Sequence, residues 1–145
     1  MTTTVTFELS RIVSITPELA WQCLTDWQGH GDWIPLTRVD VDPADPDRFT
    51  AWTGIGPLAL EDRMRLVDQQ VDGTVRRARI AKLGPVLVGE AQLSVSPGLR
   101  PDTAVVQWLE VVEMPHLPKA LAPMAGWIAK QLFTMALGRM GRHTS

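Results

Sequence analysis

The chain predicts an α+β fold in which a curved antiparallel sheet of seven strands surrounds a long C-terminal helix, with two short helices after the first strand. Three observations predict it. Apolar and polar residues alternate along most of the chain, which is typical of half-buried strands. Turn signals separate successive strands at short intervals, which favours antiparallel pairing. The apolar period lengthens to three or four residues only near residues 17–33 and after His116, which indicates helices.

Length and composition restrict the class of protein. The 145 residues predict a single domain spanning 1–145, with a core large enough to enclose a cavity. A net charge of −2 offers no basic field to nucleic acid, so we expect no nucleic-acid partner. The first ten residues lack the pattern of a signal peptide, and the single Cys23 excludes an intramolecular disulfide. We therefore expect a cytoplasmic location.

The first strand and the short helices occupy the start of the chain. Odd positions from Val5 to Ile15 are mostly apolar, which predicts a half-buried strand. Thr16 and Pro17 form a helix start, with a capping hydroxyl followed by proline at the first helical position. This helix ends near Gln28, and a turn or second short helix follows within 30–35.

Six further strands follow, separated by Gly- and Pro-containing turns. One lies around Val39 and Val41, and the others are expected at 49–55, 58–67, 74–83, 87–95 and 103–113. Residues 40–47 are expected to form an exposed hairpin connection. The strand at 74–83 has no assigned inward face, because three arginines interrupt both of its alternating sets.

The C-terminal helix is predicted from His116 to about Met140. Seven apolar residues fall on one stripe at helical spacing, and we expect that stripe to lie on the sheet: Leu121, Met124, Ala125, Ile128, Leu132, Met135 and Ala136. A membrane span is not expected, because the charge-free run from Ala120 ends at Lys130 and a span needs about 20 apolar residues. A surface anchor is also disfavoured, because the basic residues are few and spread along the helix.

Four segments carry a resemblance to a known superfamily: 17–35, 53–64, 105–113 and the terminal helix. Together with the order of elements, they resemble the START-like helix-grip (SRPBCC) superfamily, in particular its polyketide cyclase/dehydratase and lipid-transport-like branch. The resemblance implies a cavity between sheet and helix that captures a hydrophobic small molecule and, in some members, cyclises or dehydrates it. It supplies no catalytic signature to transfer residue by residue.

Charged residues interrupt the apolar sets of three strands. If Trp108 points inward, so does Glu110, while Asp62 shares a face with Met64 and Arg11 interrupts the first strand. Buried charges need a partner or a shifted pKa. The helix-grip order makes the first and last strands neighbours, which would let Arg11 reach Glu110. In a purely structural interpretation of these charges, Arg11 and Glu110 form an ion pair, and Asp62 is hydrogen-bonded to a loop amide or a Trp N–H. In the functional one, Asp62 or Glu110 exchanges a proton with an enolisable ligand and Arg11 stabilises an oxyanion.

Other candidate sites are weaker. His30, near a plausible pocket mouth, could act as a general base, although a loop His beside two glycines is more often solvated or capping. No spacing of His, Cys, Asp or Glu resembles a metal site, so neither a metal nor a cofactor is expected. The glycines of 53–57 precede a strand and not a helix, which indicates a turn instead of a phosphate-binding loop.

Three functional hypotheses follow. The first is a binding module for a polyketide- or lipid-like molecule, with a wall formed by Trp33, Trp52, Met64, Trp108, Ile128 and Leu132. The second is a cyclase or dehydratase with Asp62, Glu110 and Arg11 as its acid-base set. The third is a regulatory protein–protein module, which would show an exposed apolar patch. Monomer and homodimer both remain open.

Overall fold

A computed structural model describes residues 2–144, with side chains for all of these except 58 and 141–144. Its strands are β1 Thr3–Val13, β2 Thr37–Asp42, β3 Asp45–Thr53, β4 Leu60–Asp72, β5 Val75–Leu83, β6 Val88–Pro97 and β7 Ala104–Met114. Its helices are α1 Pro17–Thr25, α2 His30–Trp33 and α3 Ala122–Thr144, with short 3-10 turns η1 Gly56–Leu58 and η2 Lys119–Leu121.

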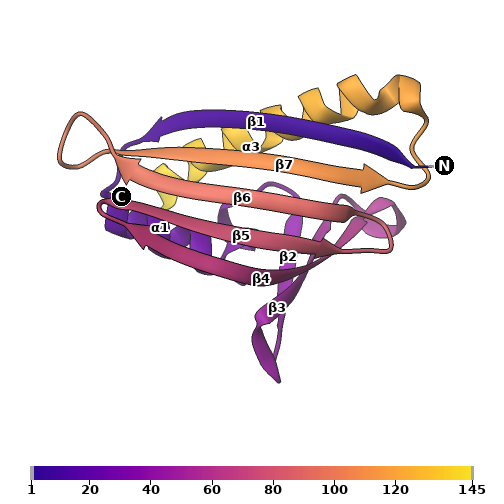
Figure 1. Cartoon of the computed structure of the whole chain (residues 1–145), viewed down its shortest axis with the longest axis horizontal. Helices are drawn as coiled ribbons and strands as arrows, with labels where there is room; N and C mark the ends of the chain where they lie inside the picture. The colour runs from indigo at the N-terminus through magenta and orange to yellow at the C-terminus, as the bar shows by residue number, and fades with distance from the viewer. Residues whose placement is uncertain (1, 145) are drawn as a thin grey trace.

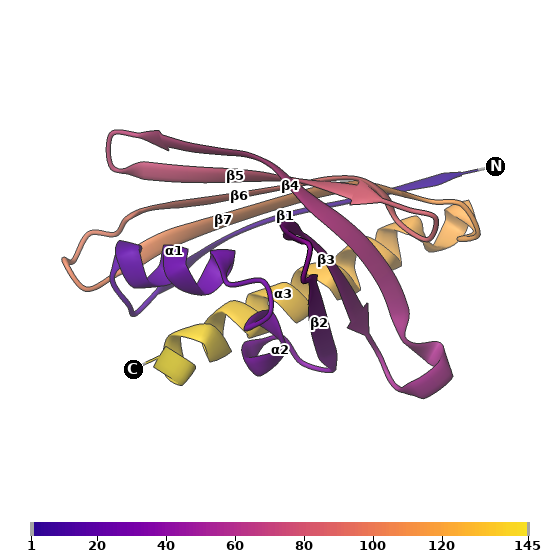
Figure 2. The same cartoon turned by 90° about the horizontal axis from the view of Figure 1, so that it is seen from below.

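The described strands form one seven-stranded sheet in the order β1-β7-β6-β5-β4-β3-β2, antiparallel at every pairing. The first and last strands are neighbours along their whole length, from Thr3 opposite Met114 to Val13 opposite Ala104. All three helices lie on the same side of the sheet, and β2 and β3 curl towards α3 (Figures 1 and 2). The predicted α+β helix-grip class is confirmed.

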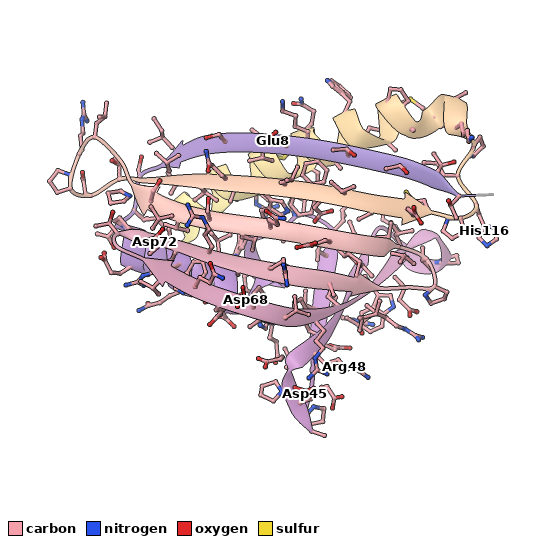
Figure 3. The ribbon with its side chains drawn as sticks, viewed as in Figure 1. Glu8, Asp45, Arg48, Asp68, Asp72 and His116 are labelled. Atoms are coloured by element: carbon pink, nitrogen blue, oxygen red, sulfur yellow. The ribbon has the colours of Figure 1, made fainter. Side chains whose placement is uncertain are left out.

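The start of the chain folds as its pattern predicts. Val5, Phe7 and Leu9 are buried on the helix side of β1. The Thr16 hydroxyl accepts a hydrogen bond from the Leu19 amide at 3.2 Å and caps α1, because it satisfies an amide that has no partner within the helix. On the opposite face of the sheet Glu8 and Asp68 point away from the helices (Figure 3). The concave face therefore carries the core and the convex face is polar.

The predicted orientation of the C-terminal helix is wrong. Met124, Ile128 and Met135 are each 53% exposed, although they belong to the stripe expected against the sheet. Of the predicted stripe only Ala136 is fully buried, while Ala125 and Leu132 are partly buried. The rest of the buried side consists of Gly126, Leu137 and Met140, with Ala129 and Phe133 partly buried. A Cβ on Gly126 would lie 2.8 Å from the Thr6 carbonyl oxygen, so the small side of the helix is the one that approaches β1 closely enough to pack.

Several boundaries also differ from the expectation. The C-terminal helix begins at Ala122 and not at His116. The connection expected at 40–47 is a tighter hairpin, because β2 extends to Asp42 and β3 already begins at Asp45. The strand expected from Leu58 begins at Leu60, after the η1 turn. The unassigned strand β5 turns Ala78, Ile80 and Lys82 towards the core, which places a lysine on the buried face.

Candidate functional site

Three charged side chains from three strands meet on the concave face of the sheet. Asp62 comes from β4, Lys82 from β5 and Glu110 from β7. The intervening strand β6 presents only small residues at this level, with Gly89 opposite Lys82 and Ala91 opposite Glu110. These small residues leave the space through which the lysine reaches across β6 to the glutamate.

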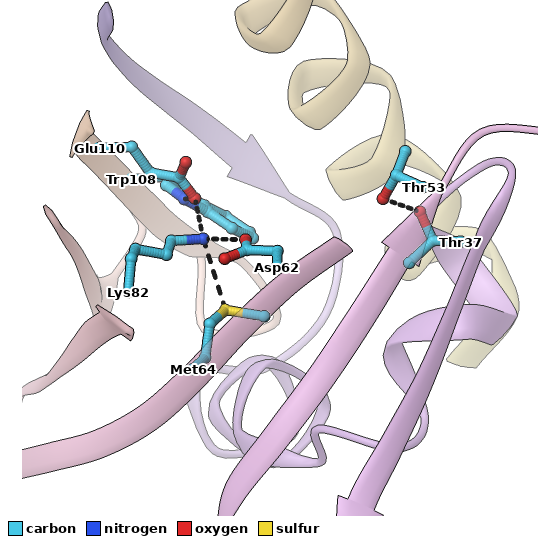
Figure 4. Close-up of polar contacts among 7 residues, drawn as sticks. All are labelled: Thr37, Thr53, Asp62, Met64, Lys82, Trp108 and Glu110. Atoms are coloured by element: carbon cyan, nitrogen blue, oxygen red, sulfur yellow. Dashed lines mark hydrogen bonds and ion pairs between the residues drawn. The ribbon is translucent and has the colours of Figure 1, made fainter. Parts of the chain in front are cut away.

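The three side chains form one hydrogen-bonded cluster, drawn in Figure 4. The Lys82 ammonium donates to Asp62 Oδ2 at 2.5 Å and lies 3.4 Å from Glu110 Oε1. It also lies 3.4 Å from the Met64 sulfur. The Trp108 indole N–H donates to Glu110 Oε1 at 3.1 Å and fixes that carboxylate from the other side.

Burial and charge together determine how the cluster ionises. Burial alone would lower the pKa of Lys82, but Glu110 and Asp62 outweigh it and raise that pKa, so the lysine stays charged. Burial raises the pKa of Asp62, an effect that Lys82 opposes and Glu110 reinforces. One cation thus faces two carboxyl groups, of which Asp62 holds a proton more tightly than an ordinary aspartate.

One oxygen of the cluster has no partner. Asp62 Oδ1 is buried and makes no hydrogen bond with any of the described residues. A buried oxygen without a partner costs about 1–3 kcal/mol, and more for a charged group. The cluster therefore contains an acceptor that a ligand hydroxyl or a water molecule would satisfy.

The cluster lines a cavity of about 60 Å³. Apolar side chains form most of its wall: Ile34, Val39, Phe49, Ala51, Met64, Ile80, Ala91, Leu93, Trp108 and Phe133. The remaining lining residues are His30, Thr37, Thr53 and the three charged residues. The hydroxyl groups of Thr37 and Thr53 lie 3.0 Å apart. This volume suits a few water molecules or one functional group, since a water occupies about 30 Å³ in the liquid.

A second, larger hollow shares one residue with the cavity. This groove of about 310 Å³ lies between the first half of α3 and strands β1 and β7, and its lining is apolar except for Glu110. Phe7 lines the groove and stacks on Phe133, with ring centroids 5.4 Å apart. On the cavity side, the ring centroids of Phe133 and Trp108 lie 4.4 Å apart. The three rings form an aromatic stack between groove and cavity.

His30 lies inside the molecule, so the expectation of a solvated or capping loop histidine is wrong. Its imidazole is buried between Trp27 and Trp33, and its Nε2 lies 2.7 Å from the Leu24 carbonyl oxygen. Because a carbonyl only accepts, Nε2 carries the proton of the neutral ring. Burial lowers the pKa of His30 to about 4, so this cavity residue is neutral at physiological pH.

Arg11 does not take the predicted position. It lies opposite Val106 in the β1–β7 register, whereas Glu110 lies opposite Phe7. The Arg11 guanidinium donates to the Thr134 carbonyl of α3 at 2.6 Å, which ties the helix to the sheet. The expected ion pair with Glu110 is therefore wrong, as is the expected Trp N–H bond to Asp62, because the Trp108 N–H donates to Glu110.

The predicted ligand wall is distributed over several places. Met64 and Trp108 line the cavity, and Ile128 and Leu132 line the groove. Trp33 is buried in the core beside His30. The remaining residue, Trp52, carries the Arg38 guanidinium 4.5 Å above its ring and lines a surface hollow.

Lys82 is the central residue that the sequence reasoning missed. The signal was present, because Ala78, Ile80 and Lys82 form one alternating set and the arginines at 77 and 79 form the other. Arg76 breaks the first set only at the outer end of the strand. Among the described residues, no group of His, Cys, Asp and Glu comes together that could hold a metal ion.

Solved structures with the same architecture define the class. The chain is similar to the ZhuI aromatase/cyclase from Streptomyces sp. R1128, with a TM-score of 0.68 and 13% identity over 98% of this chain and 96% of that one. A START superfamily protein from Mycobacterium smegmatis gives a TM-score of 0.69 at 14% identity, covering 95% of both chains. A norcoclaurine synthase mutant from Thalictrum flavum gives a TM-score of 0.66 at 14% identity, over 100% of this chain and 99% of that one. These likenesses show that the chain has the helix-grip fold.

The family is narrower than the fold. The chain belongs to the family described as polyketide cyclase / dehydrase and lipid transport, whose model matches residues 4–144. No curated protein matches the chain. In the described part of the chain, no helix is both long and apolar enough to cross a membrane.

Proposed function

We propose that the protein binds a hydrophobic small molecule between the sheet and α3, with a polar group of that molecule at the charged cluster. One observation carries the proposal: an apolar cavity ends on Asp62, whose Oδ1 is buried without a hydrogen-bond partner among the described residues. Family membership supports it, because the family description includes lipid transport and polyketide cyclisation.

The cluster indicates which polar group a ligand carries. An ionised Asp62 Oδ1 accepts a hydrogen bond, so it suits a hydroxyl, phenol or enol proton. The Lys82 ammonium suits a carbonyl or phenolate oxygen. A ligand with neighbouring hydroxyl and carbonyl groups on an aromatic or polyketide-like skeleton would satisfy both.

The apolar part of the ligand needs more room than the cavity offers. A volume of about 60 Å³ accepts only the polar end, whereas small-molecule pockets usually measure about 300–1,000 Å³. The groove of about 310 Å³ supplies that space, and Glu110 lines both hollows. Binding would therefore displace Phe133 from its position between Phe7 and Trp108 and join the groove to the cavity.

A neutral hydrophobic dye such as Nile red tests the proposal by titration. Ala51 is buried in the cavity wall, so Ala51→Leu should fill the cavity and weaken dye binding, because the polar end of the dye then loses its place beside the charged cluster. Ala81→Leu, in β5 outside the cavity lining, is the matched control and should bind like wild type. Equal binding by both variants would place the dye elsewhere and contradict the proposal.

A second candidate function is proton-transfer catalysis on an enolisable substrate. It is favoured by a specific observation, namely that Asp62 combines a raised pKa with an unpartnered oxygen beside a permanently charged lysine. In this proposal the Asp62 carboxylate removes a proton from a carbon next to a carbonyl, and Lys82 stabilises the enolate oxygen. Glu110 holds Lys82 in place, and Lys82 takes the role predicted for Arg11.

Deuterium exchange separates the enzyme from the carrier. With β-tetralone in heavy water, an enzyme should accelerate deuterium incorporation next to the carbonyl, as followed by NMR. Asp62→Asn and Glu110→Gln should abolish that acceleration, whereas Asp68→Asn on the convex face should retain it. A carrier shows Nile red binding but no acceleration in any variant, and that outcome would exclude the catalytic candidate for this class of substrate.

A further inference from the structure

The outward side of α3 is apolar. Four large side chains on it are more than half exposed, namely Met124 at 53%, Trp127 at 63%, Ile128 at 53% and Met135 at 53%. They project opposite the buried side that contains Gly126 and Leu137. A helix that packs on a sheet by one side normally presents charged and polar residues on the other. An exposed apolar patch of this kind marks an interaction surface.

The charged residues in and just before α3 are all basic. Residues 119–144 contain Lys119, Lys130, Arg139 and Arg142 but no Asp or Glu, so the segment carries a formal charge of +4. The whole chain carries −2, which leaves −6 for the rest of the molecule. The structure describes the side chains of Lys119, Lys130 and Arg139, and none of these three forms an ion pair with a described acidic residue.

The spread of the basic residues disfavours a surface anchor in the sequence, but the exposure of Met124, Ile128 and Met135 reverses that expectation. We propose that this side of α3 docks on the surface of an anionic lipid bilayer. A bilayer offers apolar chains and negative headgroups at the same boundary, and amphipathic helices with Trp and Ile beside Lys and Arg lie in that boundary. A second copy of the chain fits less well, because a symmetric contact through α3 would bring two segments of +4 together.

The groove lies next to the proposed docking surface. Ala125, Ile128, Ala129 and Leu132 of α3 form one wall of the 310 Å³ groove, and Ile128 belongs also to the exposed patch. A molecule docked through α3 would hold the groove against the lipid. An apolar ligand would then exchange between bilayer and groove without crossing bulk water.

Vesicle co-sedimentation tests the docking independently of any cavity ligand. Wild-type protein should sediment with vesicles of equimolar phosphatidylglycerol and phosphatidylcholine, much less with pure phosphatidylcholine, and less at high salt. The double variant Met124→Gln/Trp127→Gln should bind the anionic vesicles about tenfold or more weakly, because two large apolar contacts are lost. Lys119→Gln/Lys130→Gln should reduce both the binding and its salt dependence.

The matched control is Ile12→Gln/Val71→Gln, which alters two equally exposed apolar residues on β1 and β4. It should bind anionic vesicles as wild type does. The proposal is overturned if wild type fails to sediment with anionic vesicles, or if Met124→Gln/Trp127→Gln binds them as well as Ile12→Gln/Val71→Gln does. It is also overturned if wild type is a dimer that Met124→Gln/Trp127→Gln converts to a monomer, because a second copy would then cover the patch.

Discussion

Lys82 holds the polar end of the cavity together. Its ammonium is the only cation among the described residues that contacts Asp62 and Glu110, and all three side chains are mostly or fully buried. Buried charges of one sign repel strongly and lack water to screen them. The two carboxyl groups therefore depend on Lys82 for their position.

Lys82→Met should destabilise the protein by about 3 kcal/mol or more at neutral pH, because it leaves two buried carboxyl groups without their cation. The loss should shrink as pH falls, since Asp62, whose pKa is raised by burial, then becomes neutral. Urea unfolding at several pH values measures this. The triple variant Asp62→Asn/Lys82→Met/Glu110→Gln should regain most of the stability, and a Lys82→Met protein as stable as wild type at neutral pH would refute the role.

His30 makes stability depend on pH in a predictable direction. Its pKa of about 4 in the folded protein lies below the ordinary value of 6.5, so the unfolded chain binds the proton more tightly. The contribution of neutral His30 is complete above pH 6.5 and decreases as pH falls towards 4. The full difference corresponds to about 3 kcal/mol.

Urea unfolding of His30→Gln and wild type at pH 7 and pH 4.5 checks this prediction. The stability of wild type should fall more steeply with acid than that of His30→Gln, which lacks the titrating group. His116→Gln, at an exposed position near the start of α3, should keep the wild-type slope. Identical slopes for wild type and His30→Gln would show that His30 is not held neutral.

At the scale of elements, α3 is positioned by its small residues. Gly126 lies against the Thr6 carbonyl, and a Cβ there would meet backbone at 2.8 Å. Gly138 differs, because a Cβ there would meet only the far end of the Arg11 side chain, at 2.9 Å. Gly126 and Gly138 thus offer a matched pair within one helix.

Gly138→Ala should be neutral or stabilising by up to about 1 kcal/mol, since alanine favours helix over glycine by that amount. Gly126→Ala should destabilise by about 1–3 kcal/mol, because backbone cannot move aside as a side chain can. Thermal unfolding followed by circular dichroism distinguishes them. A Gly126→Ala protein as stable as Gly138→Ala would contradict the close packing of α3 on β1.

The sequence was sufficient for the elements and their order, because alternation and turn residues are local signals. Val5, Phe7 and Leu9 identify the inward face of β1 without knowledge of the fold. The buried face of α3 could not be predicted from the local pattern, because apolar residues occur on two sides of that helix. Close approach to β1 determines which side is buried, and this is the side with Gly126. Burial of Lys82 was likewise unforeseen, since its two partners come from β4 and β7.

For the whole molecule, the aromatic stack decides whether the two hollows communicate. Phe133→Ala should join the groove to the cavity and increase Nile red binding, at a cost of about 2–3 kcal/mol because Phe133 is only partly buried. Met135→Ala, on the exposed side of the same helix, should change neither property appreciably. Dye titration and urea unfolding check both. Unchanged dye binding by Phe133→Ala would show that the stack does not separate the hollows.

We propose that the space between the sheet and α3 holds an apolar molecule. Native mass spectrometry of the protein purified from its own cells tests this most directly, followed by denaturation and identification of the released compound. We predict a stoichiometric hydrophobic molecule that carries a hydroxyl or carbonyl group suited to Asp62 and Lys82. A protein that is empty as purified and also fails to take up Nile red would contradict the claim.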